Sequence, residues 1–171
     1  YTHTLLPGVG SFAFGMKAIE SKKWDLWIKE EWNILKKPFL GICLGMQMMA
    51  SYGSEGCQES EWTKGLDLIP GKVIPLNISK DLCLPHIGWN SINWKDKSNL
   101  LCSGLNLTGD YYFVHSFFFK NDSASNCVAD CNYGCNFSAV IAKDNNYGVQ
   151  FHPEKSQGLG KKILSNFLLI D

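Results

Sequence analysis

Apolar residues in the first fifty positions form two short continuous runs separated by segments with helical spacing. The runs at 2–6 and 39–43 predict buried strands, and a helix is expected to follow over 44–52. Between the strands, apolar residues recur every three or four positions, which predicts two helices that face a sheet. The expected buried stripes comprise Phe14, Ala18 and Ile19, and then Trp24, Trp27, Ile28, Trp32 and Leu35. This alternation indicates an α/β fold with a mostly parallel sheet flanked by helices.

After Gly53 the pattern changes to short apolar runs separated by Gly and Pro, which is typical of strands joined by turns. The expected strands cover 72–76, 91–94 and 111–119, a hairpin at 128–132 and 137–142, and a last core strand at 148–151. A closing helix is expected over 159–170. The chain thus combines an α/β layer with an added β-rich section, and we expect one domain over 1–171.

Composition narrows the class of protein. The 171 residues are 45% hydrophobic and 19% charged, enough apolar material for one globular domain with a sizeable core. Sixteen basic and sixteen acidic residues give zero net charge. Nothing therefore favours nucleic acid or an anionic membrane as a partner. No apolar run approaches the length that spans a membrane, and no signal peptide opens the chain.

The chain contains seven cysteines, an odd number that argues for reduced thiols in the cytoplasm and against a disulfide framework. Cys127, Cys131 and Cys135 are spaced closely enough to suggest zinc, but no histidine or fourth ligand lies nearby in the sequence. We therefore expect neither a metal nor a cofactor.

The segment Gly41-Ile42-Cys43-Leu44-Gly45-Met46-Gln47 places a cysteine where a predicted strand turns into a helix. Such an elbow needs small neighbours because the nucleophile lies on a strained turn. At a helix N-terminus we expect the pKa of the Cys43 thiol to be lowered. Cys43 is therefore a candidate nucleophile.

His152-Pro153-Glu154 supplies the partners that a cysteine nucleophile requires. An imidazole can take the thiol proton and return it to a leaving amine, and a carboxylate can hold the imidazole in one tautomer. Both Cys43 and His152 follow predicted strands, and open α/β sheets bind ligands at the carboxyl ends of their strands. We expect the two segments to meet.

The loop Pro7-Gly8-Val9-Gly10-Ser11-Phe12-Ala13 also fits a loose dinucleotide-binding pattern. Its glycines equally allow backbone N–H groups to point at an oxyanion. With a nucleophile elbow next in the sequence, we favour the second use.

Five motifs in order resemble the class I, triad-type glutamine amidotransferases, and within them the glutaminase subunit of imidazole glycerol phosphate synthase. They are Leu6 to Gly10, Gly41 to Gln47, Leu84 to Asn90, Tyr112 to Ser116 and Gly148 to Ser156. The resemblance implies a flavodoxin-like fold. It also implies that Cys43 attacks the carboxamide of glutamine, His152 moves protons, Glu154 orients His152, and water hydrolyses the thioester.

The resemblance assigns further roles. Val9, Gly10 and Leu44 would form the oxyanion site, and Trp89 and Lys155 would lie near a partner. The substrate-binding residues would be Gly8, Gln47, Glu55, His115, Ser116 and Phe117. The partner implied is a (β/α)8 cyclase in a heterodimer. It receives ammonia and makes imidazole glycerol phosphate and AICAR from PRFAR in histidine biosynthesis.

Two departures from the family pattern leave alternatives open. The family normally begins with a further strand and helix, so we expect an N-terminally incomplete domain with an exposed sheet edge. The segments around Ser54 to Gly56 and His152 to Gln157 also resemble amidotransferases that supply ammonia to an amidino-sugar synthetase in surface-sugar pathways. A redox-sensing or chaperone-like protein with an elbow cysteine, and a thiol hydrolase of the α/β-hydrolase type, are less favoured.

Overall fold

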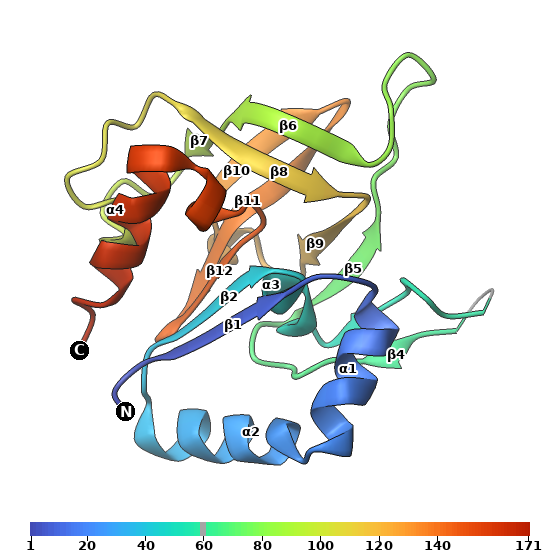
Figure 1. The fold of residues 1–171 in the computed structure, drawn as a ribbon, viewed down its shortest axis with the longest axis vertical. Coiled ribbons are helices and arrows are strands. Elements are labelled where there is room, and N and C mark those ends of the chain that lie inside the picture. The colour runs from blue at the N-terminus through green and yellow to red at the C-terminus, as the bar shows by residue number, and fades with distance from the viewer. Residues whose placement is uncertain (59–60) are drawn as a thin grey trace.

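A computed structural model describes residues 1–58 and 61–171, without the side chains of 31–34. Its central element is a six-stranded sheet with the order β1-β2-β12-β11-β10-β7 (Figure 1). The strands are β1 (Thr4–Gly8), β2 (Phe39–Cys43), β7 (Asn93–Trp94), β10 (Cys127–Tyr133), β11 (Cys135–Lys143) and β12 (Asn146–Val149).

The central sheet is mixed. Strand β2 pairs in parallel with β1 on one side and with β12 on the other, whereas β12, β11, β10 and β7 pair antiparallel. The expectation of a mostly parallel sheet therefore holds for the three strands β1, β2 and β12. Because these three run in the same direction, their carboxyl ends meet at one edge, which is where ligands bind in such sheets.

Strand β2 is buried along its whole length, which explains its continuous apolar run. On one side Leu40 and Ile42 join a core that includes Ile163 and Phe167 of α4 (Gln157–Phe167). Phe39 belongs to a second core with residues of α1 (Phe12–Ser21) and α3 (Leu44–Met48). The sheet is thus covered by helices on both faces.

The β-rich section forms two smaller sheets. One has the order β4-β3-β5-β9, and the other pairs β6 with β8. Their strands are β3 (Tyr52–Gly53), β4 (Thr63–Lys64), β5 (Gly71–Pro75), β6 (His86–Ser91), β8 (Asp110–His115) and β9 (Phe117–Asn121). Short 3-10 helices complete the order: η1 (Leu100–Cys102), η2 (Ala124–Asn126) and η3 (Pro153–Lys155).

The expected single strand over 111–119 is wrong, because the chain changes sheets at Ser116. Strand β8 pairs with β6 before that residue, and β9 pairs with β5 after it. The carbonyl of Ser116 accepts a hydrogen bond from the Leu76 N–H at 2.9 Å. Apolar residues continue across the break, so the pattern alone did not reveal it.

The predicted hairpin is confirmed by β10 and β11, but several boundaries differ. The helix after the elbow ends at Met48, well before the expected 52. The last core strand is 146–149, so its chain continues as a loop before His152, and α4 begins at Gln157. Strands at 86–91 and 93–94 replace the one expected over 91–94.

The buried faces of the first two helices differ from those predicted. In α1 the buried residues are Phe12, Met16 and Ile19, whereas Phe14 is 71% exposed and Ala18 is also exposed. In α2 (Trp24–Leu35), Ile28 is buried and Trp24, Trp27 and Leu35 are exposed. The expectation for Trp32 concerns a side chain outside those described. Helix α2 packs mainly against α1, and the side chains of Trp24 and Trp27 stay outside the core.

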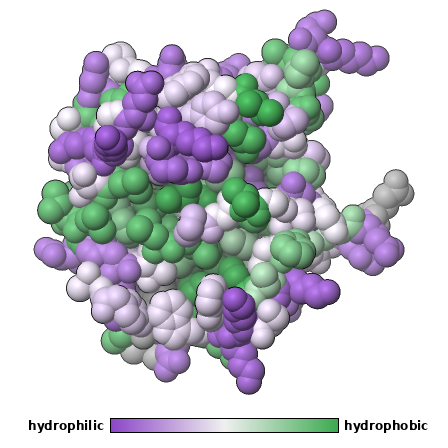
Figure 2. Space-filling model, in the orientation of Figure 1, coloured by the Kyte–Doolittle hydropathy of each residue, from purple (hydrophilic) through white to green (hydrophobic). Residues whose placement is uncertain are grey.

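Strand β1 forms an edge of the central sheet, as expected. Beside it lies an open cavity of about 590 Å³ lined by residues of β1 and α2, including Leu5, Trp24 and Trp27. Figure 2 shows an apolar band across this face of the molecule. Within the described residues, no helix has the length and apolar character needed to cross a bilayer.

Candidate active site

The elbow after β2 has the strained geometry that its sequence predicted. The backbone of Cys43 has φ 53° and ψ −110°, and residues other than glycine rarely adopt such a positive φ. A β-carbon on Gly41 would lie 2.6 Å from the backbone nitrogen of Met46. The small residue before the bend therefore lets α3 fold back closely against β2, and the cysteine is held at the turn.

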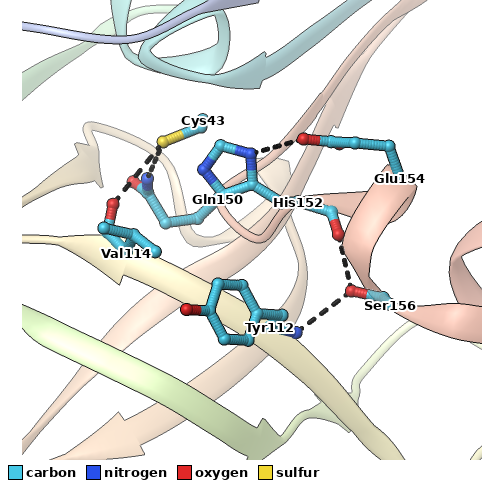
Figure 3. Close-up of polar contacts among 7 residues, drawn as sticks. All are labelled: Cys43, Tyr112, Val114, Gln150, His152, Glu154 and Ser156. Carbon is cyan, nitrogen blue, oxygen red and sulfur yellow. Dashed lines mark hydrogen bonds and ion pairs between the residues drawn. The ribbon is translucent and has the colours of Figure 1, made fainter.

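The sulfur of Cys43 lies in a largely buried environment. Its Sγ is 3.8 Å from the carbonyl oxygen of Val114, and the side-chain amide of Gln150 donates toward it, also at 3.8 Å (Figure 3). Burial raises the pKa of Cys43 to about 11, although hydrogen bonds from the Leu44 N–H and from Gln150 favour the thiolate. The expected lowering of the pKa is therefore wrong. The desolvation of the buried sulfur raises the pKa by more than the N-terminus of the five-residue helix α3 lowers it.

His152 lies between the cysteine and a carboxylate. Figure 3 shows its imidazole between Cys43 and Glu154, and its Nδ1 is 2.8 Å from Oε1 of Glu154. The Nδ1 atom carries the proton in this contact, because a carboxylate can only accept. The Nε2 atom is then left with a lone pair that can take a proton.

The loop that carries His152 is tied to strand β8. The backbone N–H of His152 donates to the carbonyl of Tyr112 at 2.8 Å. The buried hydroxyl of Ser156 donates to the His152 carbonyl at 2.7 Å and accepts from the Tyr112 N–H at 3.0 Å (Figure 3). These bonds fix the imidazole although the residue lies beyond the last strand.

The residues predicted from the sequence meet around one pocket of about 220 Å³. Ten of them line it: Val9, Gly10, Cys43, Leu44, Gln47, Glu55, His115, Ser116, Phe117 and His152. Pro85 and Val114 also line it and were not expected. Gly8 is not among the lining residues, although it lies in register with Cys43 on the neighbouring strand. A pocket of this size suits a small metabolite.

Glu55 connects the pocket wall to a helix. Its carboxylate accepts a hydrogen bond from the Phe12 N–H at 3.0 Å, and its carbonyl accepts from the Ala13 N–H at 3.2 Å. These are free N–H groups of the first turn of α1. Burial raises the pKa of Glu55, and the bond from Phe12 opposes that shift. The contact also fixes the start of the helix that follows the Val9–Gly10 loop.

The Val9–Gly10 loop and Leu44 border the same pocket as the sulfur. Gly10 has φ 105°, and no atom would lie within 4 Å of a β-carbon there. The backbone conformation, not the available space, therefore favours glycine at this position. A loop with this freedom can direct an N–H group toward an oxyanion.

The model for "Glutamine amidotransferase class-I" matches residues 3–170. This chain belongs to the class-I glutamine amidotransferase family. The chain is 49% identical over 173 residues to imidazole glycerol phosphate synthase subunit HisH 1 of Prochlorococcus marinus, covering 100% of this chain and 80% of the relative. It is 47% identical to subunit HisH of Methanosarcina barkeri, covering 96% and 77% of the two chains.

Solved structures support the fold of this amidotransferase. A structure of PurLQS from Thermotoga maritima superposes with a TM-score of 0.69 at 17% identity, covering 99% of this chain and 79% of that one. A glutamine amidotransferase from Thermotoga maritima gives a TM-score of 0.65 at 18% identity, covering 98% of this chain and 63% of that one. The flavodoxin-like α/β fold predicted from the sequence is confirmed.

The two residues expected at a partner interface lie together on the surface of this amidotransferase. The Trp89 ring is 5.7 Å from the Tyr112 ring in an edge-on arrangement, and Lys155 Nζ lies 5.5 Å from the centre of the same ring. Trp89 is 47% exposed. Tyr112 also donates and accepts the backbone bonds that hold His152, so this surface is joined to the pocket.

Sequence reasoning missed Gln150 and gave Ser156 no role. Gln150 is fully buried, and its position two residues before His152 was the only available signal. A buried glutamine needs partners for its amide.

In the described part of the chain, no three His, Cys, Asp or Glu residues gather in a way that would hold a metal ion.

Proposed function

We propose that this amidotransferase hydrolyses glutamine to glutamate and ammonia through a thioester on Cys43. His152 takes the thiol proton and returns it to the leaving ammonia, and Glu154 holds His152 in the required tautomer. The thioester is then hydrolysed by water, which regenerates the thiol. The observation that carries this proposal is the convergence of Cys43, His152 and the Val9–Gly10 loop on one small pocket.

The raised pKa of Cys43 shapes the mechanism. Near neutral pH the resting sulfur is a thiol, so attack on the carboxamide requires proton transfer to His152 as the substrate binds. The N–H groups of Leu44 and of the Val9–Gly10 loop would stabilise the oxyanion that forms. A buried thiol also suits a redox sensor poorly, because sensor cysteines are accessible and have a low pKa.

We assign the acceptor of the ammonia from the relatives. Three of them, with 43–49% identity over 95% or more of this chain, are named as HisH subunits of imidazole glycerol phosphate synthase. The proposed partner is therefore the cyclase subunit of that synthase, bound at the surface around Trp89, Tyr112 and Lys155. An exposed tryptophan beside a tyrosine and a lysine is a suitable centre for an interface. With that partner, the ammonia released from glutamine would be used in histidine biosynthesis.

The seven cysteines are all free thiols, which supports the cytoplasm as the compartment.

The test is glutamate release from glutamine by the wild-type chain and by Cys43→Ala, with and without the cyclase and its ligand. We expect turnover to rise sharply when the cyclase is added and to be lost in Cys43→Ala. Equal turnover with and without the cyclase would refute the assigned partner. Equal turnover of wild type and Cys43→Ala would refute the hydrolytic mechanism.

A further inference from the structure

Two buried histidines face each other beside the pocket, outside the Cys43 and His152 pair. His86 on β6 and His115 on β8 are opposite one another in register. They are 2% and 6% exposed, and His86 Nδ1 lies 3.0 Å from His115 Nε2. The His86 ring also stacks on Tyr133 at 4.0 Å and on Phe113 at 5.0 Å between ring centres. These contacts hold its plane.

The inner end of the pair determines where its protons lie. His115 Nδ1 is 2.8 Å from the carbonyl oxygen of Phe117, which can only accept a hydrogen bond. A neutral His115 therefore carries its proton on Nδ1 and offers a lone pair on Nε2. His86 must then donate to that lone pair from its own Nδ1.

The outer end of the pair agrees with this assignment. With its proton on Nδ1, His86 has a lone pair on Nε2, and the amide nitrogen of Asn90 lies 3.4 Å from that atom. The same nitrogen donates to the carbonyl of Asn132 at 3.0 Å. That carbonyl fixes the orientation of the Asn90 amide independently of the histidines. Both ends of the pair thus require the same tautomer.

Burial favours the neutral form of both rings, as this assignment requires. It lowers the pKa of His86, and it lowers the pKa of His115 to about 4. The neighbouring His86 and His152 also disfavour a positive charge on His115.

The Phe117 carbonyl accepts a second hydrogen bond that leads toward the nucleophile. Gln47 Nε2 donates to it at 2.9 Å and to Gln150 Oε1 at 3.0 Å. With its oxygen turned to Gln47, Gln150 presents its amide N–H groups to Cys43 Sγ at 3.8 Å. A single carbonyl therefore sets the direction of both amides, and the last one is a donor directed at the sulfur.

We propose that His86 and His115 are positioning residues for the reaction at Cys43, a role that rests on the proposed function. The hydrogen bond from His86 to Nε2 stabilises the His115 tautomer that donates to the Phe117 carbonyl, and this donation holds the carbonyl in place as the acceptor for Gln47. The amide pair of Gln47 and Gln150 is thereby held with a donor toward the sulfur. Such a donor stabilises negative charge on the sulfur as it forms.

The first test is ¹⁵N NMR of the full chain labelled at histidine, which reports which ring nitrogen carries the proton. The chain has four histidines. We expect His86 and His115 to carry the proton on Nδ1. His3 provides an internal control with the opposite tautomer, because its Nε2 lies 2.8 Å from the carbonyl of Ile170. A proton on Nε2 of His115 in the wild-type chain would overturn the proposal.

The second test compares two substitutions of His86 in the rate of Cys43 alkylation by a glutamine analogue that carries an electrophile. His86→Phe keeps a ring between Tyr133 and Phe113 but removes the donor. His86→Asn removes the ring but keeps a donor near the position of Nδ1. We expect His86→Phe to lower the maximal alkylation rate about fivefold to tenfold, the effect of one net hydrogen bond, with half-saturation changed less than about twofold. We expect His86→Asn to recover a rate within about threefold of wild type, with lower thermal stability.

If the role of His86 were merely structural, His86→Asn would be alkylated more slowly than His86→Phe, because it loses the packed ring. That result would overturn the proposal. If His86→Phe fails to fold, the tautomers of the wild-type chain still decide the question. If the analogue does not label wild-type Cys43 while the tautomers are as expected, the proposed function fails and the hydrogen-bond chain stands.

Discussion

Gly45 and Leu6 are packed so closely that a β-carbon at residue 45 would overlap the carbonyl of Leu6. This contact brings α3 against β1, directly after the nucleophile. We expect Gly45→Ala to lower the free energy of unfolding by about 3 kcal/mol, because the backbone of one element must move. Chemical denaturation measures this loss.

Gly158→Ala provides the matched control for that substitution. Gly158 lies in α4, where no atom would be within 4 Å of a new β-carbon. Its unfolding free energy should be unchanged or raised by up to about 1 kcal/mol, since alanine favours helix. Equal destabilisation by both substitutions would contradict the close packing at the elbow.

The raised pKa of Cys43 predicts a specific pH dependence. The thiolate is the reactive form, so a pKa of about 11 leaves the resting thiol largely unreactive near neutral pH. Alkylation of Cys43 by iodoacetamide should therefore increase about tenfold per pH unit from pH 7 to about pH 10. Peptide mapping measures the rate, with exposed Cys83 as an internal reference. A plateau below pH 8 would show that the thiol ionises readily.

Removal of the charge on Glu154 tests the orientation of His152. Glu154→Gln replaces the acceptor at 2.8 Å from Nδ1 with an amide, which can present a donor and favour the other tautomer. We expect the maximal rate of glutamine hydrolysis in the complex with the cyclase to fall at least about tenfold. Glu20→Gln, on the exposed face of α1, is the control and should keep the wild-type rate. Similar rates for both variants would exclude this role for Glu154.

The proposed docking surface predicts a difference between two tryptophans of similar exposure. Trp89 is 47% exposed beside Tyr112, and Trp62 is 45% exposed on the segment before β4. Trp89→Ala should weaken binding of the cyclase by about tenfold or more, as expected for a central aromatic residue. Trp62→Ala should leave the dissociation constant unchanged. Calorimetric titration measures both, and equal effects would place the interface elsewhere.

The elbow and the pocket were predictable because their chemistry is encoded in short motifs. The glycines around Cys43 indicated a sharp bend, and the positive φ of Cys43 confirms it. The pKa of Cys43 was not predictable, since it depends on the burial that the β8 and β12 segments impose. Gln150 was missed for the same reason, because its partners Gln47 and Cys43 lie more than one hundred residues away in the sequence.

The helix faces were the least predictable part of the fold. The apolar residues of α1 lie on two adjacent faces of the helix, and either face could have been the buried one. The sequence did not reveal that Phe12, not Phe14, contacts Gly53. In α2 the apolar stripe was predicted correctly at Ile28 but not at Trp24 and Trp27, which line the open cavity beside β1. Periodicity locates a helix but does not tell which part of its apolar surface another element covers.

The most direct test is mass-spectrometric mapping of the chain after reaction with a glutamine analogue that carries a diazoketone. The mechanism predicts one added glutamine-like group, on the peptide that contains Cys43, and protection from labelling by excess glutamine. Labelling should be absent from Cys43→Ala and slow in a His152→Ala variant. Unchanged labelling in Cys43→Ala, or labelling that glutamine does not suppress, would contradict the assignment of Cys43 as the nucleophile.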